Sequence, residues 1–306
     1  MSGPAVKTLL VITGPTASGK TGLAIELAQH LNTSIISADS RQCYQGMAIG
    51  TAQPTADELA TVKHYFIDLF PVAEPVTAAD FERLALGWLE EIFATADTAI
   101  VCGGTGLYIR ALCEGLDEMP EVEPGIIVEI DASYKAYGLT WLQEALLKED
   151  PAFVGNPEWS NPARLMRALG FVRSTGKSIL DYRSGIKKSR PFRIVKVALD
   201  LPREVLYARI NARVDAMMAA GLLEEVRSLV PHRHYKALQT VGYAELFDYL
   251  DGICTLEAAI DKIRQHTRNY AKRQLTWLKR EEGVNWVRGK GAEKTAQILQ
   301  MLRTYP

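Results

Sequence analysis

The stretch of sequence that decides the fold is Lys7–Thr21, KTLLVITGPTASGKT. Its first seven residues form a short apolar run of the kind found in buried strands. A glycine-rich turn then leads into Gly19–Leu31, where leucines recur every four residues, as on one face of a helix. The turn consists of Gly14, Pro15, Thr16, Ala17, Ser18, Gly19, Lys20 and Thr21, and it matches the pattern Gly-x-x-x-x-Gly-Lys-Ser/Thr in full. The preceding strand and the following helix are the context that this motif requires.

A loop of this kind binds phosphate groups. Its glycines allow a tight turn in which successive backbone N–H groups point at one anion, and the start of the helix adds partial positive charge. Lys20 adds a full charge, and the hydroxyl of Thr21 can ligate Mg²⁺. The motif is also typical of ATP-binding proteins. We therefore predict a diphosphate or polyphosphate ligand on Gly14–Thr21, with Mg²⁺ as cofactor and Thr21 as its ligand.

Strand and helix patterns alternate through the first 115 residues. Three further apolar runs are typical of strands, and an amphipathic helix is predicted over Ala78–Phe93. The predicted strands are Ser34–Ala38, His64–Leu69 and Thr98–Cys102. This alternation indicates an α/β fold, a parallel sheet flanked by helices of the P-loop NTPase type.

The middle of the chain breaks this alternation. Glu114–Gly125 is acidic and holds two prolines, and the segments after it, Thr140–Leu147 and Pro162–Ser174, have helical spacing without a strand pattern. We predict a helical insertion over residues 116–191. Phe192–Leu199 is predicted to return as a strand of the sheet, and Val284–Val287 to form an edge strand before a last helix. Helices are predicted over Arg203–Met218, Leu222–Leu229, Tyr243–Tyr249 and Leu256–Lys279. The catalytic core would thus comprise residues 1–115 and 192–306.

The charges are unevenly spread along the chain. In total, 35 Lys and Arg balance 36 Asp and Glu over 306 residues, for a formal net charge of −1. Residues 111–134 hold seven acids and no Lys or Arg, whereas residues 161–193 hold nine Lys or Arg and one acid. Residues 262–280 hold seven Lys or Arg and no acid, with Arg264, Arg268 and Lys272 on one helical face. A single run of like charges is as often a solvent-exposed face as a binding surface. Two separate basic stretches with few or no acids favour a polyanionic partner.

Several classes of protein are excluded by the sequence. No stretch approaches the roughly 18 apolar residues of a membrane span, and the N-terminal apolar run indicates a strand rather than a signal peptide. The four cysteines are far apart, without a CxxC pair, and the five histidines form no cluster. A disulfide framework or a zinc site is therefore not expected. We expect a cytoplasmic monomer.

A second glycine-rich turn replaces an acid that ATPases and kinases usually have. In those proteins an Asp that helps to hold Mg²⁺ follows an apolar strand, but here Thr98–Cys102 is followed by Gly103-Gly104-Thr105-Gly106. The acid that is present, Asp39, comes just after the second predicted strand. Ligands gather outside the carboxyl ends of parallel strands, so Asp39 and the phosphate loop should face one crevice. From its position alone, Asp39 could bind Mg²⁺, cap a helix or act as a general base.

Six motifs together resemble one family. GPTASGKT, SADSRQCY, GGTGLY, ARVDAMM, TVGYAE and AKRQLTWLKR occur in that order between Lys7 and about Trp286. In this combination the chain resembles the tRNA dimethylallyltransferases, also called tRNA isopentenyltransferases. The resemblance implies that the loop binds dimethylallyl diphosphate, whose five-carbon group is transferred to N6 of adenosine 37 beside the tRNA anticodon. The diphosphate would be a leaving group, which accounts for the absence of an acid that activates water.

The resemblance also implies roles for individual residues. Asp39 would hydrogen-bond the adenine N6 and take its proton, while Thr105, Arg213 and Lys20 would lie at the diphosphate. The adenosine must be flipped out of its stack to reach a buried carbon. The tRNA-contacting residues implied are Asp39, Ser40, Arg41, Gln42, Thr105, Arg164, Arg167, Val241, Gly242, Tyr243, Lys272, Arg273, Gln274 and Lys279, with the insertion contacting the anticodon arm. For Trp277, at heptad spacing, we favour core packing.

The predicted insertion departs most from the family pattern. Ile126–Ser133 has no arginine, the residues before Asn161 lack a His-Pro pair, and Gly170 stands where a glutamate is commoner. Two other function classes remain as alternatives. The chain could be a P-loop kinase of a small metabolite or nucleoside, against which the GGTG turn argues. It could also be an RNA-binding module with a structural anion site, against which Asp39 argues.

Overall fold

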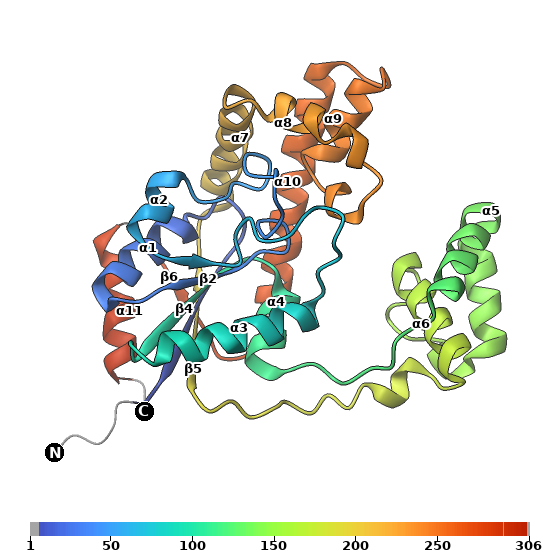
Figure 1. Ribbon diagram of the computed structural model, residues 1–306, viewed down its shortest axis with the longest axis horizontal. Helices are drawn as coiled ribbons and strands as arrows, with labels where there is room; N and C mark the ends of the chain where they lie inside the picture. The colour runs from blue at the N-terminus through green and yellow to red at the C-terminus, as the bar shows by residue number, and fades with distance from the viewer. Residues whose placement is uncertain (1–5, 290, 305–306) are drawn as a thin grey trace. The chain divides into compact units, whose positions relative to one another are not determined.

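The chain divides into two compact units. The computed structural model describes residues 6–289 and 291–304. The first unit comprises the residues up to Glu114 together with those from Ser189 onward, and the second is Gly115–Lys188 (Figure 1). The predicted insertion, residues 116–191, therefore extends three residues beyond the second unit.

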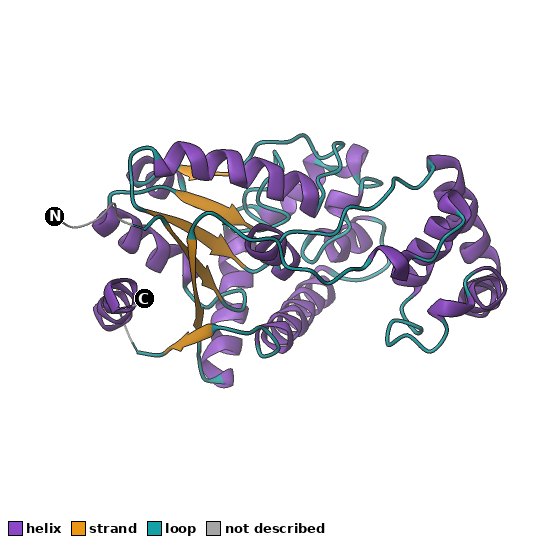
Figure 2. Cartoon of the chain, turned by 90° about the horizontal axis from the view of Figure 1, so that it is seen from below, coloured by secondary structure: helices purple, strands orange, loops and turns teal. Residues whose placement is uncertain are grey.

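A six-stranded parallel sheet forms the centre of the first unit (Figure 2). The strand order is β3-β2-β4-β1-β5-β6. The strands are β1 (Thr8–Thr13), β2 (Ile35–Ala38), β3 (His64–Tyr65), β4 (Thr98–Gly103), β5 (Arg193–Leu199) and β6 (Val284–Val287). The central strand β1 is buried along its whole length, as expected for a parallel sheet covered by helices on both faces. The predicted α/β fold is thus confirmed.

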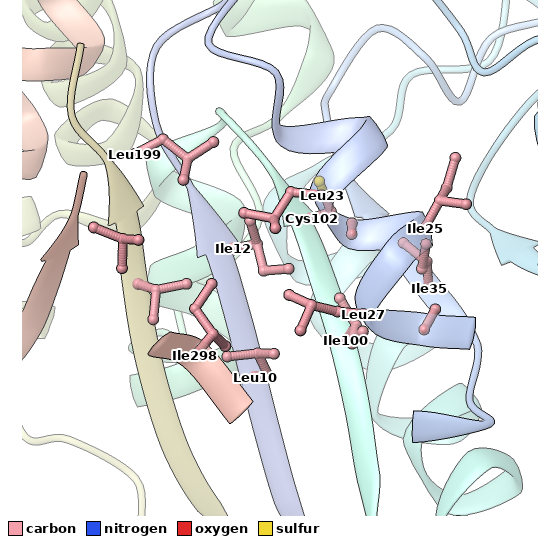
Figure 3. Close-up of a cluster of buried hydrophobic side chains, with 14 of the residues drawn as sticks. Leu10, Ile12, Leu23, Ile25, Leu27, Ile35, Ile100, Cys102, Leu199 and Ile298 are labelled. Carbon is pink, nitrogen blue, oxygen red and sulfur yellow. The ribbon is translucent and has the colours of Figure 1, made fainter. Parts of the chain in front are cut away.

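Helices cover both faces of this sheet. The helices of the first unit are α1 (Lys20–Leu31), α2 (Ala56–Thr61), α3 (Ala78–Phe93), α4 (Gly106–Glu114), α7 (Arg203–Ala219), α8 (Leu222–Ser228), α9 (Tyr243–Leu250), α10 (Leu256–Leu278) and α11 (Ala292–Thr304), with 3₁₀ turns at Val230–His232 and Lys236–Leu238. Alternate side chains of β1, Leu10 and Ile12, pack against Leu27 of α1 and Ile298 of α11 in one apolar cluster (Figure 3). α3 and α4 lie on the opposite face (Figure 2). The core therefore packs against the faces of the sheet, and the carboxyl ends of the strands remain available for a binding site.

Two local features differ from the sequence-based prediction. The strand predicted over His64–Leu69 ends at Tyr65, because Phe66 and Asp68 have φ values of +65° and +50° and turn the chain away from the sheet. Helix α4 was not predicted, since the glycines before it indicated only a turn. It begins at Gly106, directly after the turn, so that the turn and the helix form one continuous feature.

The second unit is a small helical domain with its own core. It contains α5 (Pro124–Glu149), α6 (Pro162–Thr175) and 3₁₀ turns at Pro151–Phe153 and Ile179–Tyr182. All of its residues are described, and none forms a strand. α5 begins 16 residues before the predicted helix and is interrupted at Gly138, where φ is +73°. Gly170 is buried, and a Cβ there would lie 3.1 Å from Cγ1 of Val122, so its missing side chain makes room for that residue.

Candidate functional site

Three strands of the sheet end level with one another. In the register of the sheet, Gly103 of β4 lies beside both Thr13 of β1 and Ala38 of β2. β2 and β4 approach so closely that a Cβ on Gly103 would lie 2.2 Å from the carbonyl oxygen of Ala38. The phosphate loop, the segment that begins at Asp39 and the GGTG turn consequently start from adjacent points on one edge of the sheet, as predicted.

The phosphate loop, Gly14–Thr21, is folded tightly before α1. Gly19 and Ala17 have φ values of +90° and +62°, which reverse the chain within a few residues. The backbone N–H of Ser18 donates to Pro15 O at 3.2 Å, and Lys20 Nζ donates to the same oxygen at 2.8 Å. The hydroxyl of Ser18 is buried and has no partner among the described residues. A tight loop with a lysine and an unused buried hydroxyl suits a phosphate group.

Two basic side chains meet at this loop. Burial, with a smaller contribution from nearby Arg213, lowers the pKa of Lys20 to about 8, while Cys102 and Asp39 oppose the shift. Arg213 extends from α7, and its Nη1 donates to Thr16 Oγ1 at 3.4 Å. Burial also lowers the pKa of Arg213. The structure therefore brings Arg213 to the phosphate loop, where a phosphate ligand would compensate the two buried positive charges.

A third cation at the loop was not predicted. Arg209 Nη1 donates to the carbonyl oxygen of Ser18 at 3.4 Å. Arg209 lies one helical turn before Arg213 on α7, so both side chains project from one face of this helix. This i, i+4 spacing of arginines was the available signal in the sequence.

Asp39 organises the segment that follows β2. Its Oδ1 accepts the N–H groups of Arg41 and Gln42 at 2.9 and 3.4 Å. The N–H of Ser40 donates to Thr105 Oγ1 at 3.0 Å, and the N–H of Thr105 donates to the carbonyl oxygen of Ala38 at 3.1 Å. The structure therefore brings Asp39, Ser40 and Thr105 together, although they come from two separate motifs.

The side chain of Gln42 is engaged within the protein. Its Oε1 accepts from Ser37 Oγ at 2.9 Å, and its Nε2 donates to the carbonyl oxygens of Thr51 and Ala52 at 3.2 and 2.8 Å. These bonds tie the Asp39 segment to the loop that contains residues 47–53. Gln42 thus stabilises the shape of the site from within.

Tyr243 is buried, which contradicts its predicted contact with RNA. The side chain is 0% exposed, and its hydroxyl donates to Glu225 Oε1 at 2.6 Å. The same carboxylate accepts the N–H groups of Ile49 and Gly50 at 2.8 and 2.9 Å. Burial and Glu225 both raise the pKa of Tyr243. Gly242 is also buried and Val241 is half-buried, so Tyr243 serves the core and holds the loop at residue 50.

Helix α10 presents a different set of cations from the one predicted. Arg264 pairs with Asp215 and Asp261, and Arg268 Nη1 donates to Asn211 Oδ1 at 2.8 Å. These two arginines are occupied by protein partners, two of which belong to α7. The exposed cations lie nearer the end of the helix, at Lys272, Arg273 and Lys279. RNA would have to compete with these partners for Arg264 and Arg268, and the predicted cationic face stays a prediction for both.

A stripe of α10 packs on the GGTG turn. This α10 stripe consists of Tyr270, Gln274 and Trp277, spaced i, i+4 and i+7 along the helix. The Tyr270 phenol hydrogen-bonds with the side chain of Thr105, and burial and Asp39 raise its pKa to about 12. A Cβ on Gly106 would lie 2.5 Å from the ring of Trp277. Trp277 therefore packs against the GGTG turn while remaining half-buried.

Gln274 lies at the centre of this stripe and is only 7% exposed. Its Oε1 accepts the N–H of Thr16 at 2.8 Å, and its Nε2 donates to the carbonyl oxygen of Gly104 at 3.0 Å. Both ends of the carboxamide are thus used inside the protein, and the predicted contact of Gln274 with RNA is contradicted. Gln274 lies four residues after Tyr270 and three before Trp277, so this spacing was the available signal that it shares their helical face.

Several arginines of the second unit are paired within that unit. Arg164 and Arg183 share Glu158, and Arg173 bridges Glu149 and Glu129. These acids lie outside the basic stretch of sequence and partly neutralise it. Arg164 remains 57% exposed and Arg167 is also exposed, although partial desolvation lowers the pKa of Arg167. Contact of Arg164 and Arg167 with tRNA stays a prediction.

The described residues contain neither a cluster of metal-ligating side chains nor a membrane-spanning helix. No group of three or more His, Cys, Asp or Glu side chains in residues 6–289 and 291–304 is arranged to hold a metal ion. Over the same residues, every helix is too short or too polar to cross a membrane. A metal at the site would therefore depend on the ligand's own oxygens together with a hydroxyl such as that of Thr21.

Comparison with known proteins places the chain in a family. Residues 42–281 match the IPP transferase family. The chain belongs to this family. It is 44% identical to the tRNA dimethylallyltransferase of Flavobacterium johnsoniae over 287 residues, which cover 92% of this chain and 93% of that relative. It is 43% identical to tRNA dimethylallyltransferase 1 of Phocaeicola vulgatus over 297 residues, 97% and 98% of the two chains. The family resemblance noted in the sequence is confirmed.

Solved structures of IPP transferases share this fold. The full-length tRNA isopentenylpyrophosphate transferase of Bacillus halodurans is 36% identical, with a TM-score of 0.72 over 97% of this chain and 96% of that one. A eukaryotic dimethylallyltransferase acting on tRNA is 24% identical, with a TM-score of 0.79 over 96% of this chain and 78% of that one. At that identity, the second likeness shows the fold alone.

Proposed function

We propose that this protein transfers the dimethylallyl group of dimethylallyl diphosphate to N6 of adenosine 37, next to the anticodon of tRNA, giving N6-isopentenyladenosine. The observation that carries this proposal is the convergence of the phosphate loop, Asp39 and Thr105 at one edge of the sheet. The family, whose members at more than 40% identity are named tRNA dimethylallyltransferases, supports it. The enzyme is accordingly a prenyltransferase.

The diphosphate end of the substrate would bind at the phosphate loop. Lys20, Arg213 and the amides of the loop would face the negative charge that develops on the departing diphosphate, and fixed positive groups there would lower the barrier. The unpartnered hydroxyl of Ser18 provides a further donor. Mg²⁺, when bound with the diphosphate, would be held by Thr21 and would neutralise part of that charge.

Asp39 would take the proton from the attacking amine. Its Oδ1 is held by the amides of Arg41 and Gln42, whereas its Oδ2 has no hydrogen-bond partner among the described residues. Oδ2 can therefore accept a hydrogen bond from the adenine N6. As the new C–N bond forms, the allylic C–O bond breaks, its electron pair leaves with the diphosphate, and the N6 proton passes to Asp39.

The RNA would be bound by the exposed cations. Lys272, Arg273 and Lys279 are exposed and would meet phosphates, and the adenosine would have to leave its stack to enter the site. Arg41, two residues after Asp39, would meet the flipped base or its neighbours. We propose that the second unit contacts the anticodon arm through Arg164 and Arg167. The proposed setting of the reaction is the cytoplasm, and the proposed active species is a monomer.

A labelling experiment tests this proposal. The protein is incubated with radiolabelled dimethylallyl diphosphate, Mg²⁺ and unmodified tRNA with adenosines at positions 36 to 38. We expect label in the RNA, at N6 of adenosine 37 after nuclease digestion and chromatography. Unlabelled RNA, together with transfer of phosphate from ATP to a small acceptor, would show instead that the protein is a kinase.

A matched pair of variants tests the role of Asp39. Asp39→Asn retains an oxygen for the amides of Arg41 and Gln42 but cannot take a proton, so the transfer rate should fall by about a hundred- to ten-thousandfold. Asp97→Asn, at the amino end of β4, is the control and should retain wild-type activity. Both variants should bind tRNA as the wild type does. A large loss of tRNA affinity in Asp39→Asn would instead assign Asp39 a role in binding.

A further inference from the structure

The phosphate loop and the GGTG turn are joined by one side chain. Their backbones come from different strands, and Gln274 of α10 reaches both of them. Because it bonds to main-chain atoms at each end, its carboxamide sets the separation of the two segments directly. Gln274 comes from a third element, more than 160 residues away in sequence from either turn.

The orientation of the carboxamide is fixed by what it meets. Thr16 offers an N–H, which requires the oxygen of Gln274, and Gly104 offers a carbonyl oxygen, which requires the nitrogen. Turning the amide over would place two donors together at Thr16 and two acceptors together at Gly104. The Thr16 N–H already donates to Gln274 Oε1. The diphosphate would therefore have to bind the amides later in the loop.

Gly104 is shaped to receive Gln274. A Cβ at this glycine would lie 2.2 Å from Nε2 and 3.3 Å from Cδ of Gln274, while its next neighbour would be Gly14 O at 3.6 Å. The absence of a side chain at Gly104 is therefore what allows the carboxamide to approach. The backbone of Gly104 does not have a positive φ, so alanine can adopt its conformation and would act by displacing Gln274.

We propose that Gln274 is a positioning residue, which holds the diphosphate-binding loop at a fixed distance from the turn that carries Thr105. The proposal rests on the proposed function for the identity of the substrate. Physically, Gln274 would hold the amides of the loop and the Thr105 hydroxyl at a fixed separation around one diphosphate. Misplacement of catalytic groups by about an ångström is costly, so a side chain that fixes their distance affects the rate without contacting the substrate.

The neighbouring residues of α10 make the inference specific. Lys272 and Arg273 are exposed, whereas Gln274 lies in the α10 stripe and is buried. A residue that contacts RNA and one that positions the phosphate loop should therefore differ in which substrate's KM they change. The KM for dimethylallyl diphosphate and the KM for tRNA can be measured in the same steady-state transfer assay.

The first test uses Gln274→Ala, with Lys272→Ala as its counterpart from the outer face of the helix. For Gln274→Ala we expect the KM for dimethylallyl diphosphate to rise and kcat to fall, each by about tenfold, as is typical for the loss of one or two hydrogen bonds. The KM for tRNA should stay within twofold of wild type. Lys272→Ala should do the reverse and raise only the KM for tRNA. A Gln274→Ala variant that raised only the KM for tRNA would overturn the proposal.

The second test is a double-mutant cycle with Gly104. Gly104→Ala should displace the carboxamide and reproduce the effect of Gln274→Ala. Once Gln274 is alanine, the added methyl group at Gly104 has nothing to displace. The double variant should therefore be no worse than about twofold below Gln274→Ala, whereas independent effects would multiply to about a hundredfold. Multiplicative losses would refute a direct contact between the two residues.

Two further measurements distinguish a failure of the positioning role from a folding defect and from a failure of the proposed function. Gln274→Met preserves the volume of the side chain without its polar atoms, and it should show the same KM pattern if Gln274→Ala fails to fold. Binding of inorganic pyrophosphate by calorimetry does not depend on the prenyl reaction. If the wild type binds pyrophosphate in a Gln274-dependent manner but transfers no prenyl group to tRNA, the proposed function fails and the positioning role stands.

Discussion

Raising the pH above 8 is expected to weaken binding of the diphosphate, because Lys20 loses its proton. An ordinary lysine is fully charged at pH 9, but burial lowers the pKa of Lys20 from 10.5 to about 8. Arg213 acts in the same direction, and Asp39 and Cys102 oppose it. At pH 7 about nine-tenths of Lys20 is charged and at pH 9 about one-tenth, so the apparent Kd should rise about tenfold between these values.

The measurement is calorimetric titration with inorganic pyrophosphate and Mg²⁺ at half-unit steps of pH between 6.5 and 9.5. Lys20→Met is the control, because it has no proton to lose in this range and should bind weakly at every pH. The wild-type affinity should approach that of Lys20→Met as the pH rises. A wild-type affinity that stayed constant to pH 9.5 would refute the assignment of a lowered pKa to Lys20.

The lowered pKa of Lys20 also predicts that the stability of the fold depends on pH. Between pH 8 and 10.5 the unfolded chain holds a proton on Lys20 that the folded chain has released, so stability rises with pH across this window. A shift from 10.5 to about 8 corresponds to about 3 kcal/mol. The difference in free energy of unfolding between wild type and Lys20→Met, from urea titrations, should change by this order across the window. An unchanged difference would contradict the prediction.

Three other substitutions have defined outcomes. Gly50→Ala would place a Cβ 2.5 Å from the Tyr243 hydroxyl and should cost about 1–3 kcal/mol in a urea titration; an unchanged midpoint would refute the close contact. Arg190→Met removes the partner of buried Glu82 and should cost about 3–5 kcal/mol, seen as a lower melting temperature. Lys272→Ala should reduce the log–log salt slope of tRNA binding by about one unit; an unchanged slope would place this face away from the RNA.

The elements that local sequence patterns specify were predicted well. Lys7–Thr21 specifies a strand, a phosphate loop and a helix through contacts within one short segment, and parallel strands bring Asp39 and Thr105 to the same edge. The order of strands and helices was likewise evident from their alternation. These features depend on spacing along the chain, which a single sequence displays directly.

The partners of polar side chains could not be predicted in this way. Arg264 and Arg268 belong to a run without acids, yet their partners on α7 lie 49 and 57 residues away in sequence. Tyr243 follows a glycine in a motif that looks polar. It is nevertheless buried, and its hydroxyl donates to Glu225 of another helix. Helix α4 was missed because its first residue is a glycine of the preceding turn.

The helical insertion begins and ends at nearly the same point. A Cβ on Gly115, where the segment starts, would lie 2.5 Å from Cδ of Lys188, where it ends. Closing so short a gap would cost the remaining chain little entropy, so a few residues could replace the whole segment without stretching the sheet. We therefore expect this segment to tolerate changes of length and sequence without displacement of the strands of the first unit. The departures from the family pattern at Ile126–Ser133 and Gly170 fall within this segment.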